Sequence, residues 1–113
     1  MHVQIINFQL NGIDDAQYRS ACDDDAAAFS ALPGLLSKIW LADQSTNTYG
    51  GVYLWRDRTA MDGFVDGDVF QGITADPRVA NVTSREFEVL EAPTSVTHGL
   101  PPARVQSTGL RPD

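Results

Sequence analysis

The chain has 113 residues, one cysteine and a formal net charge of −7 at pH 7. This length suits one domain with its own core, and a single cysteine excludes an internal disulfide framework. The eight Lys and Arg residues are scattered, which argues against nucleic acid as a partner because phosphate binding needs clustered basic side chains.

The sequence shows no signal for export or membrane insertion. No apolar run at the N-terminus is followed by a small-residue cleavage site, and no segment approaches the roughly 18 apolar residues of a membrane span. With the single cysteine, this leads us to expect a cytoplasmic protein. A Ser/His/Asp triad, a phosphate-binding glycine loop and a paired Cys/His metal set are also absent from the sequence, which argues against hydrolase, nucleotide-binding and zinc functions.

The first expected element is a strand over Val3–Leu10, because these residues are β-branched and aromatic and the Asn11-Gly12 pair that follows is typical of a turn. Asn7 interrupts this apolar run. A buried amide is usually hydrogen-bonded, since leaving it unsatisfied costs about 1–3 kcal/mol. A structural amide and a substrate contact are both compatible with this position.

A helix is expected next, capped by Asp14 or Asp15 and ending at Ala31. Its residues at three- and four-residue steps form one stripe, which comprises Tyr18, Ala21, Cys22, Asp25, Ala28, Phe29 and Leu32. Asp25 is the charged member of this stripe. It lies either at the margin of a solvated acidic face or between helix and sheet, where a carboxylate could act as a general base.

A hairpin follows, with strands over Leu35–Ala42 and Gly50–Arg56 and a polar turn between them. Alternation places aliphatic side chains on one face of these strands, and on the other it places Lys38, Trp40, Gly51, Tyr53 and Trp55. The three rings of that second face amount to roughly 500 Å² of apolar surface. We expect a partner subunit, a ligand or both to cover it.

The second half of the chain predicts a helix capped by Asp57 or Thr59 and interrupted near Gly67, then a strand over Val79–Leu90. The expected inward residues of the helix are Ala60, Met61, Phe64, Val65, Phe70 and Ile73. A polar row on the strand, formed by Ser84, Glu86 and Glu88, could supply a cross-strand partner for Lys38. Residues 1–93 would form the domain, and residues 94–113 a loose tail that could dock on a partner subunit.

The resulting order, β-α-β-β-α-β, is that of an α+β, ferredoxin-like fold. Right-handed crossovers place both helices on one face of the sheet. The bare face would then be covered by a second copy, which predicts a homodimer with its two sheets forming a shared barrel.

Four short segments resemble one known family, the YdhR-like monooxygenases of the dimeric α/β-barrel superfamily. They are Pro33-Gly34, Lys38-Ile39-Trp40, Gly50-Gly51-Val52-Tyr53-Leu54 and Phe87-Glu88-Val89. The resemblance implies the dimeric barrel fold and kinship with antibiotic-biosynthesis monooxygenases, which oxidise polycyclic phenols without metal or flavin. Haem-degrading relatives use an Asn, a Trp and an iron-binding His. Asn7 matches the first, but Phe64 and Thr74 stand near the places of the other two, which argues against haem.

The resemblance therefore suggests a cofactor-independent monooxygenase acting with molecular oxygen on an aromatic or polyketide-like phenolic small molecule. Trp40, Tyr53 and Phe64 would bind the substrate. Asn7 and Lys38 would stabilise its anion, and Asp25 or a water would take the proton. An isomerase or cyclase of the same fold, and a non-catalytic small-molecule-binding dimer, are the alternatives.

Overall fold

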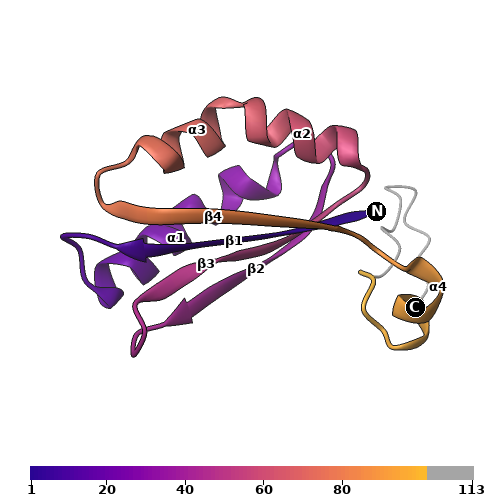
Figure 1. The fold of residues 1–113 in the computed structure, drawn as a ribbon, viewed down its shortest axis with the longest axis horizontal. Coiled ribbons are helices and arrows are strands. Elements are labelled where there is room, and N and C mark those ends of the chain that lie inside the picture. Colours follow the sequence, from indigo (N-terminus) through magenta and orange to yellow (C-terminus); the bar gives the residue numbers. More distant parts are fainter. Residues whose placement is uncertain (102–113) are drawn as a thin grey trace.

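A computed structural model describes residues 1–101 of the chain (Figure 1). Its elements follow one another as β1 (His2–Leu10), α1 (Asp15–Ser30), β2 (Leu35–Asp43), β3 (Thr48–Trp55), α2 (Arg58–Asp66), α3 (Asp68–Ala75), β4 (Val79–Glu88) and α4 (Glu91–Val96). The strands form one antiparallel sheet in the order β2-β3-β1-β4. This is the predicted α+β, ferredoxin-like arrangement, and the prediction is confirmed.

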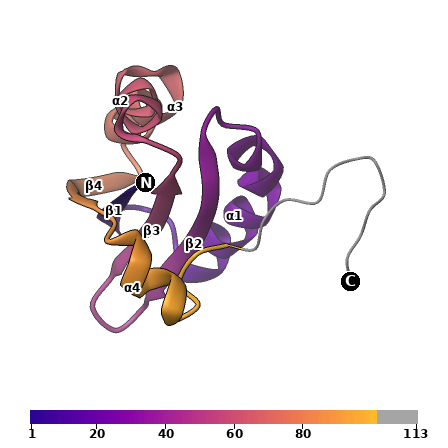
Figure 2. The same cartoon turned by 90° about the vertical axis from the view of Figure 1, so that its right-hand side faces the viewer.

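Helices α1, α2 and α3 lie on one side of the sheet, and α4 lies near the end at which the N-terminus is found (Figures 1 and 2). Within residues 1–101, no helix combines the length and the apolar character needed to cross a membrane.

The aromatic face of the sheet is the one that the helices cover. Trp55 is 0% exposed and Tyr53 is 2% exposed. The ring of Phe64, from α2, lies 5.0 Å from that of Trp55 and 5.3 Å from that of Tyr53. A partner or ligand is therefore not needed to shield these rings from water. The expectation that the aromatic face requires one is wrong for Tyr53 and Trp55, because the chain's own helices bury them, whereas Trp40 is half-buried.

Gln4 is a polar side chain buried within this aromatic layer, and it is 0% exposed. Its carbonyl oxygen accepts a hydrogen bond from the Trp55 indole at 3.0 Å, and its amide nitrogen donates to the Ser84 hydroxyl at 2.9 Å. Both polar ends are satisfied, which avoids the cost of burying an amide. Gln4 thereby links β1 to the strands on either side.

The opposite face of the sheet is aliphatic and open. Strand register places Ile39, Val52, Ile5 and Arg85 in one row across it, and Ser37, Leu54, Val3 and Phe87 in the next. Ile39 is 62% exposed and Phe87 is 44% exposed. We call this surface the open face.

The helix boundaries follow the capping residues that the sequence offers. Asp14 forms a capping box with Gln17: its carboxylate accepts from the Gln17 backbone, and the Gln17 side chain accepts from the Asp14 backbone. The Asp57 carboxylate accepts from the Ala60 backbone at 2.8 Å at the start of α2. Gly67 separates α2 from α3. The predicted break at Gly67 is confirmed.

Helix α4 was not predicted from the sequence. It spans six residues, Glu91–Val96, too few to show a hydrophobic period, and Pro93 lies in its first turn, where the missing N–H breaks no helical hydrogen bond. The expected boundary between residues 93 and 94 falls inside this helix. Residues 102–113, most of the expected tail, lie outside the described part of the chain.

Candidate functional site

A small cavity lies between α1, α3 and the aromatic face of the sheet, with a volume of about 130 Å³. Four of the six candidate residues line it: Asp25 from α1, Lys38 and Trp40 from β2, and Tyr53 from β3. We call it the Lys38 cavity. Its walls also include Phe8, Tyr18, Cys22, Phe29, Ile73, Asp76 and Arg78. Candidate residues distant in sequence thus meet at one cavity.

The amine of Lys38 lies against aromatic rings. Its Nζ is 3.3 Å from the ring centroid of Trp40, 3.6 Å from that of Phe29 and 4.6 Å from that of Tyr53. Gly51 makes this position possible, because a Cβ on that residue would lie 2.8 Å from the Cε of Lys38. The side chain therefore passes over a glycine to reach the rings.

No ion pair involves Lys38 within residues 1–101. The expected cross-strand partners, such as Glu86, lie on β4, and β2 and β4 are the two opposite edges of the sheet. That prediction is wrong, because β3 and β1 stand between the two strands. The sequence showed the parity of the polar row but not the strand order.

Burial lowers the pKa of the Lys38 amine to about 7, while the nearby Cys22 and Asp25 partly oppose the shift. The ring faces oppose it further, because an aromatic quadrupole attracts the ammonium form. Burial raises the pKa of the Tyr18 and Tyr53 phenols well above their usual range and also raises the pKa of the Cys22 thiol. Among these four groups, the amine is the one that changes charge near neutral pH.

Asp25 lines the Lys38 cavity but its side chain is exposed, so it stands at the rim. The nearby Asp76 and Arg78 also line the cavity and pair with each other at 2.8 Å. Asp25 thus lies at the boundary between the cavity and the solvent. The two interpretations of the sequence, a solvated residue and one facing the sheet, each describe part of its position.

Asn7 lies on the other side of the sheet. Its neighbours Ile6 and Phe8 are 1% and 7% exposed and belong to the core under the helices, so alternation turns Asn7 to the open face. Its amide nitrogen donates to the Tyr49 carbonyl at 3.3 Å. Asn7 and Lys38 therefore do not face a common site.

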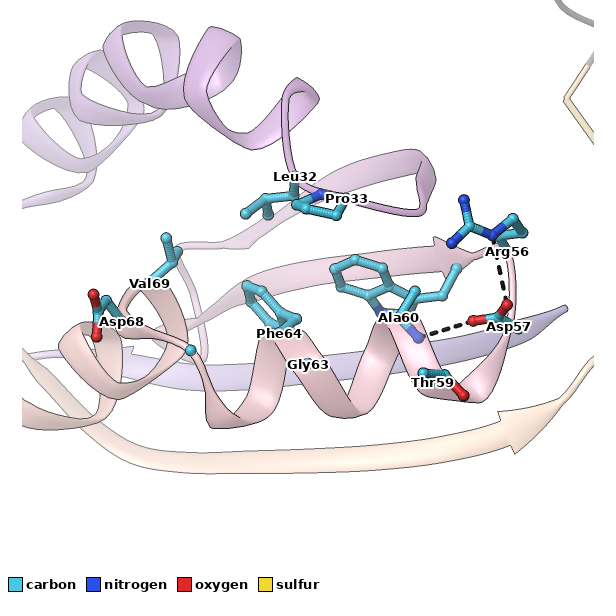
Figure 3. Close-up of a pocket in the computed structure, with 12 residues that line it drawn as sticks. Leu32, Pro33, Arg56, Asp57, Thr59, Ala60, Gly63, Phe64, Asp68 and Val69 are labelled. Carbon is cyan, nitrogen blue, oxygen red and sulfur yellow. Dashed lines mark hydrogen bonds and ion pairs between the residues drawn. The ribbon is translucent and has the colours of Figure 1, made fainter.

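Phe64 lines a second cavity, between α2, the start of α3 and the turn that follows α1, with a volume of about 420 Å³. Figure 3 shows Phe64 projecting from α2 toward Leu32 and Pro33, with Arg56 and Asp57 at one end. We call this the α2 cavity. It is largely apolar, and its size lies within the usual range of ligand pockets, roughly 300–1,000 Å³.

A family model described as "Putative mono-oxygenase ydhR" matches residues 3–100. The chain belongs to the YdhR family. No curated protein matches it.

Solved structures share the fold of this YdhR-family chain at low sequence identity. One is a "putative antibiotic biosynthesis monooxygenase" from Deinococcus radiodurans (21% identity, TM-score 0.66, covering 81% of this chain and 95% of that one). Another is SnoaB, a cofactor-independent oxygenase from Streptomyces nogalater (23%, 0.60, 78% and 92%). A third is the haem-degrader MhuD from Mycobacterium tuberculosis (19%, 0.63, 80% and 96%). At such identities the likeness establishes the fold alone.

The MhuD structure holds two haems in its active site, so we asked whether the YdhR-family chain offers a comparable site. The sequence contains two histidines, His2 and His98, and neither lines the Lys38 cavity or the α2 cavity. A haem iron in either cavity would find no imidazole ligand. The residues present do not fit a histidine-ligated haem.

Tyr18, Cys22 and Phe29 are among the residues of the Lys38 cavity that were not predicted as site residues. All three belong to the helical stripe that contains Asp25, and that shared stripe was the available signal. Helical periodicity shows that residues share a face. It does not show which residue of the sheet they meet, so the contact of Phe29 with Lys38 could not be read from it.

Proposed function

We propose that this protein is a cofactor-independent monooxygenase that oxidises an aromatic or polyketide-like phenol, with the reacting ring bound in the Lys38 cavity. The observation that supports this most directly is a half-buried amine set among ring faces. Such a site can bind a flat apolar molecule, accept its proton and hold the resulting anion. Membership in the YdhR family supports the general class of reaction.

The volume of the cavity limits what can react there. An apolar cavity of about 150 Å³ holds benzene in an engineered protein, so the slightly smaller Lys38 cavity of about 130 Å³ suits one ring at most. A neighbouring hollow of about 200 Å³ also includes Phe29, Lys38 and Trp40 among its walls. We expect the reacting ring to bind beneath α1, with the rest of a larger substrate in this second hollow.

In the proposed mechanism, the unprotonated amine of Lys38 takes a proton from the substrate. The ammonium that forms stays beside the new anion and is stabilised by the ring faces of Phe29 and Trp40. Asp25, at the rim, passes the proton to solvent. Asn7 has a structural role on the other face of the sheet. Lys38 therefore combines the roles of base and anion holder, which the sequence analysis had divided between several residues.

The electrons for oxygen come from the substrate itself. A ring CH₂ group made acidic by a conjugated ring carbonyl, as in an anthrone or the keto tautomer of a phenol, loses its proton to the amine, and the carbanion then reacts with O₂. One oxygen atom becomes the C=O oxygen and the other leaves as water, so the substrate carbon supplies all four electrons. This balance requires no external reductant.

We further propose that the protein works as a homodimer that buries the open face. Of the exposed large apolar side chains within residues 1–101, Ile39 and Phe87 lie on that face and Leu90 and Val96 lie at α4, while Val69 lies on the helix layer. A hollow of about 510 Å³ between α4 and the open face continues the same apolar surface. A second copy would cover both.

The test of the enzyme proposal is oxygen consumption by purified protein with anthrone-type and single-ring phenols. We expect uptake with the wild type and a loss of at least about 100-fold in kcat for both Lys38→Met and Lys38→Arg, because arginine keeps the charge but cannot act as a base near neutral pH. Product mass separates oxygenation from isomerisation. An active Lys38→Arg variant would remove the amine from the mechanism, and a wild type that consumes no oxygen with any of these phenols would contradict the proposal.

A further inference from the structure

Lys38 is the only lysine in the chain. Lysines are mostly exposed, whereas this one is largely buried in a cavity. We propose that Lys38 is also a nucleophile, and that the cavity binds small aldehydes or ketones as reversible imines on its Nζ. This chemistry goes beyond the oxygenation proposed above and does not depend on it.

The surroundings of the amine favour nucleophilic attack. Its Nζ lies over the faces of Phe29, Trp40 and Tyr53, and no hydrogen bond or ion pair from it to a carboxylate occurs within residues 1–101. Desolvation in an apolar pocket is one of the ways in which proteins activate a lysine. The lowered pKa of this amine agrees with that geometry.

The cavity limits the carbonyl compound to one of small size. About 130 Å³ is available next to the amine, and the walls nearest to it are aromatic. An aromatic aldehyde of one ring fits both the volume and the walls. Within residues 1–101, a charged carbonyl compound such as a keto acid would find no free cation at the walls of the cavity besides Lys38 itself, because the Arg78 guanidinium at the rim is paired with Asp76.

The proposed step balances without an oxidant or reductant. The Nζ lone pair attacks the carbonyl carbon, and the C=O π electrons move to the oxygen, which takes up a proton. The carbinolamine then loses water as the C=N bond forms, so amine and carbonyl give imine and one water. The protons move through solvent at the rim, where Asp25 stands.

Several titratable groups face the amine and set the pH at which it reacts. They are Tyr18, Cys22 and Asp25 from α1, Tyr53 from β3, and Asp76 and Arg78 from the turn between α3 and β4. A free lysine has a pKa of about 10.4, so roughly 0.04% of it is unprotonated at pH 7. At a pKa of about 7 the unprotonated share of Lys38 is about half.

The experiment traps the imine with benzaldehyde and cyanoborohydride at pH 7, without oxygen, and locates the adduct by peptide mass mapping. The protein offers two primary amines, Met1 and Lys38. We expect Lys38 in the folded protein to be labelled at least tenfold faster than the same residue in the urea-unfolded protein. Nα-acetyl-lysine added to both samples serves as the reference, since its labelling ratio reports the effect of urea on the reagent, whereas the Met1 amine also loses its ion pair with Glu91 on unfolding.

Equal or slower labelling of Lys38 in the folded protein would overturn the proposal, and this comparison needs no variant. In Lys38→Arg we expect an adduct at Met1 alone, and an additional adduct elsewhere would show that another group is the nucleophile. The two proposals fail separately. Trapping without oxygen uptake would refute only the monooxygenase, and oxygen uptake without trapping would refute only the imine.

Discussion

The side chain of Lys38 reaches its cavity because Gly51 has no side chain. The neighbouring Gly50 is required for a different reason: its φ is +141°, and a Cβ there would lie 1.8 Å from the Ile6 carbonyl oxygen. Gly50 therefore permits the close approach of two strands, and Gly51 leaves room for the Lys38 amine. Both effects depend on contacts across the sheet.

Replacing Gly51 with alanine should move the Lys38 amine at little cost in stability. The new Cβ would lie 2.8 Å from Lys38 Cε, near the end of a flexible side chain, and 3.2 Å from both the Ile39 carbonyl oxygen and a Tyr53 ring carbon. We expect Gly51→Ala to lower the free energy of unfolding by about 1–2 kcal/mol and to slow benzaldehyde trapping at Lys38. Urea unfolding and trapping rates measure the two effects.

Gly72→Ala is the matched control, because nothing lies within 4 Å of its new Cβ and it sits inside α3. It should raise the free energy of unfolding by about 0.5–1 kcal/mol and leave trapping unchanged. If Gly51→Ala traps benzaldehyde at the wild-type rate, Gly51 does not position the amine.

The titration of Lys38 should make stability depend on pH. An unfolded lysine keeps its proton to about pH 10.4, but burial lowers the pKa in the folded protein to about 7. Between these values the unfolded chain binds more protons, so the free energy of unfolding rises with pH. Because the ring faces favour the ammonium and the side chain is partly exposed, we expect a rise on the order of 1–2 kcal/mol rather than the full shift.

Urea unfolding of wild type and Lys38→Met between pH 6.5 and 9.5 measures this effect. Subtraction removes the titration of every other group, including the amine of Met1. We expect the wild type to gain stability relative to the variant as pH rises. A difference that is flat with pH, or that falls, would show that Lys38 keeps an ordinary pKa.

At the scale of elements, α1 packs on the sheet through half-buried side chains, among them Tyr18 and Phe29, and is fixed at its start by a cap. None of its residues is fully buried. Its first turn is fixed by the Asp14–Gln17 capping box and by Asp15, which accepts a hydrogen bond from the Tyr49 hydroxyl at 2.6 Å. Because α1 provides one wall of the Lys38 cavity, the cap that fixes the start of α1 also helps to fix the shape of this cavity.

Asp14→Ala should therefore cost about 1 kcal/mol of stability and weaken the binding of a ring in the cavity. Asp14→Asn is the control, because asparagine caps helices about as well as aspartate. Hydrogen exchange of the amides in the first turn of α1 measures the fraying directly. Equal protection in wild type and Asp14→Ala would show that the capping box does not hold this turn.

The elements themselves could be predicted where a period or a cap was present. Such patterns predicted the break at Gly67 and the two faces of the hairpin, one aromatic and one aliphatic. Helix α4 has neither a hydrophobic period nor a side-chain cap, so it was missed. That Asn7 and Lys38 lie on opposite faces of the sheet could not be predicted for a related reason. Alternation shows which residues of one strand share a face, but only the register between strands shows which face of one strand matches which face of the next.

At the scale of the whole molecule, the decisive property is which face of the sheet the helices cover. Alternation gives the sheet two distinct faces, and right-handed crossovers place the helices on one side of it. Alternation alone does not show which set of residues the helices cover. Burial of the ring-bearing set leaves an aliphatic surface as the candidate for self-association. The aromatic set is then available to line cavities within each subunit.

We expect the wild type to be a dimer at micromolar concentration and Ile39→Glu to dissociate it. Ile39 is 62% exposed in the subunit and lies in the central row of the open face beside Val52. A carboxylate there would have to leave water when the dimer forms, and this desolvation opposes association. The dissociation constant should rise at least about 100-fold, equivalent to about 2.7 kcal/mol, as measured by sedimentation velocity.

Val69→Glu is the control, because Val69 is an exposed apolar residue, 42% accessible, on the helix layer. It should leave the dissociation constant unchanged. Equal weakening by both variants would point to a general loss of structure rather than a broken interface, and circular dichroism distinguishes the two. If the wild type sediments as a single subunit at tens of micromolar, the open face must be covered by something other than a second copy.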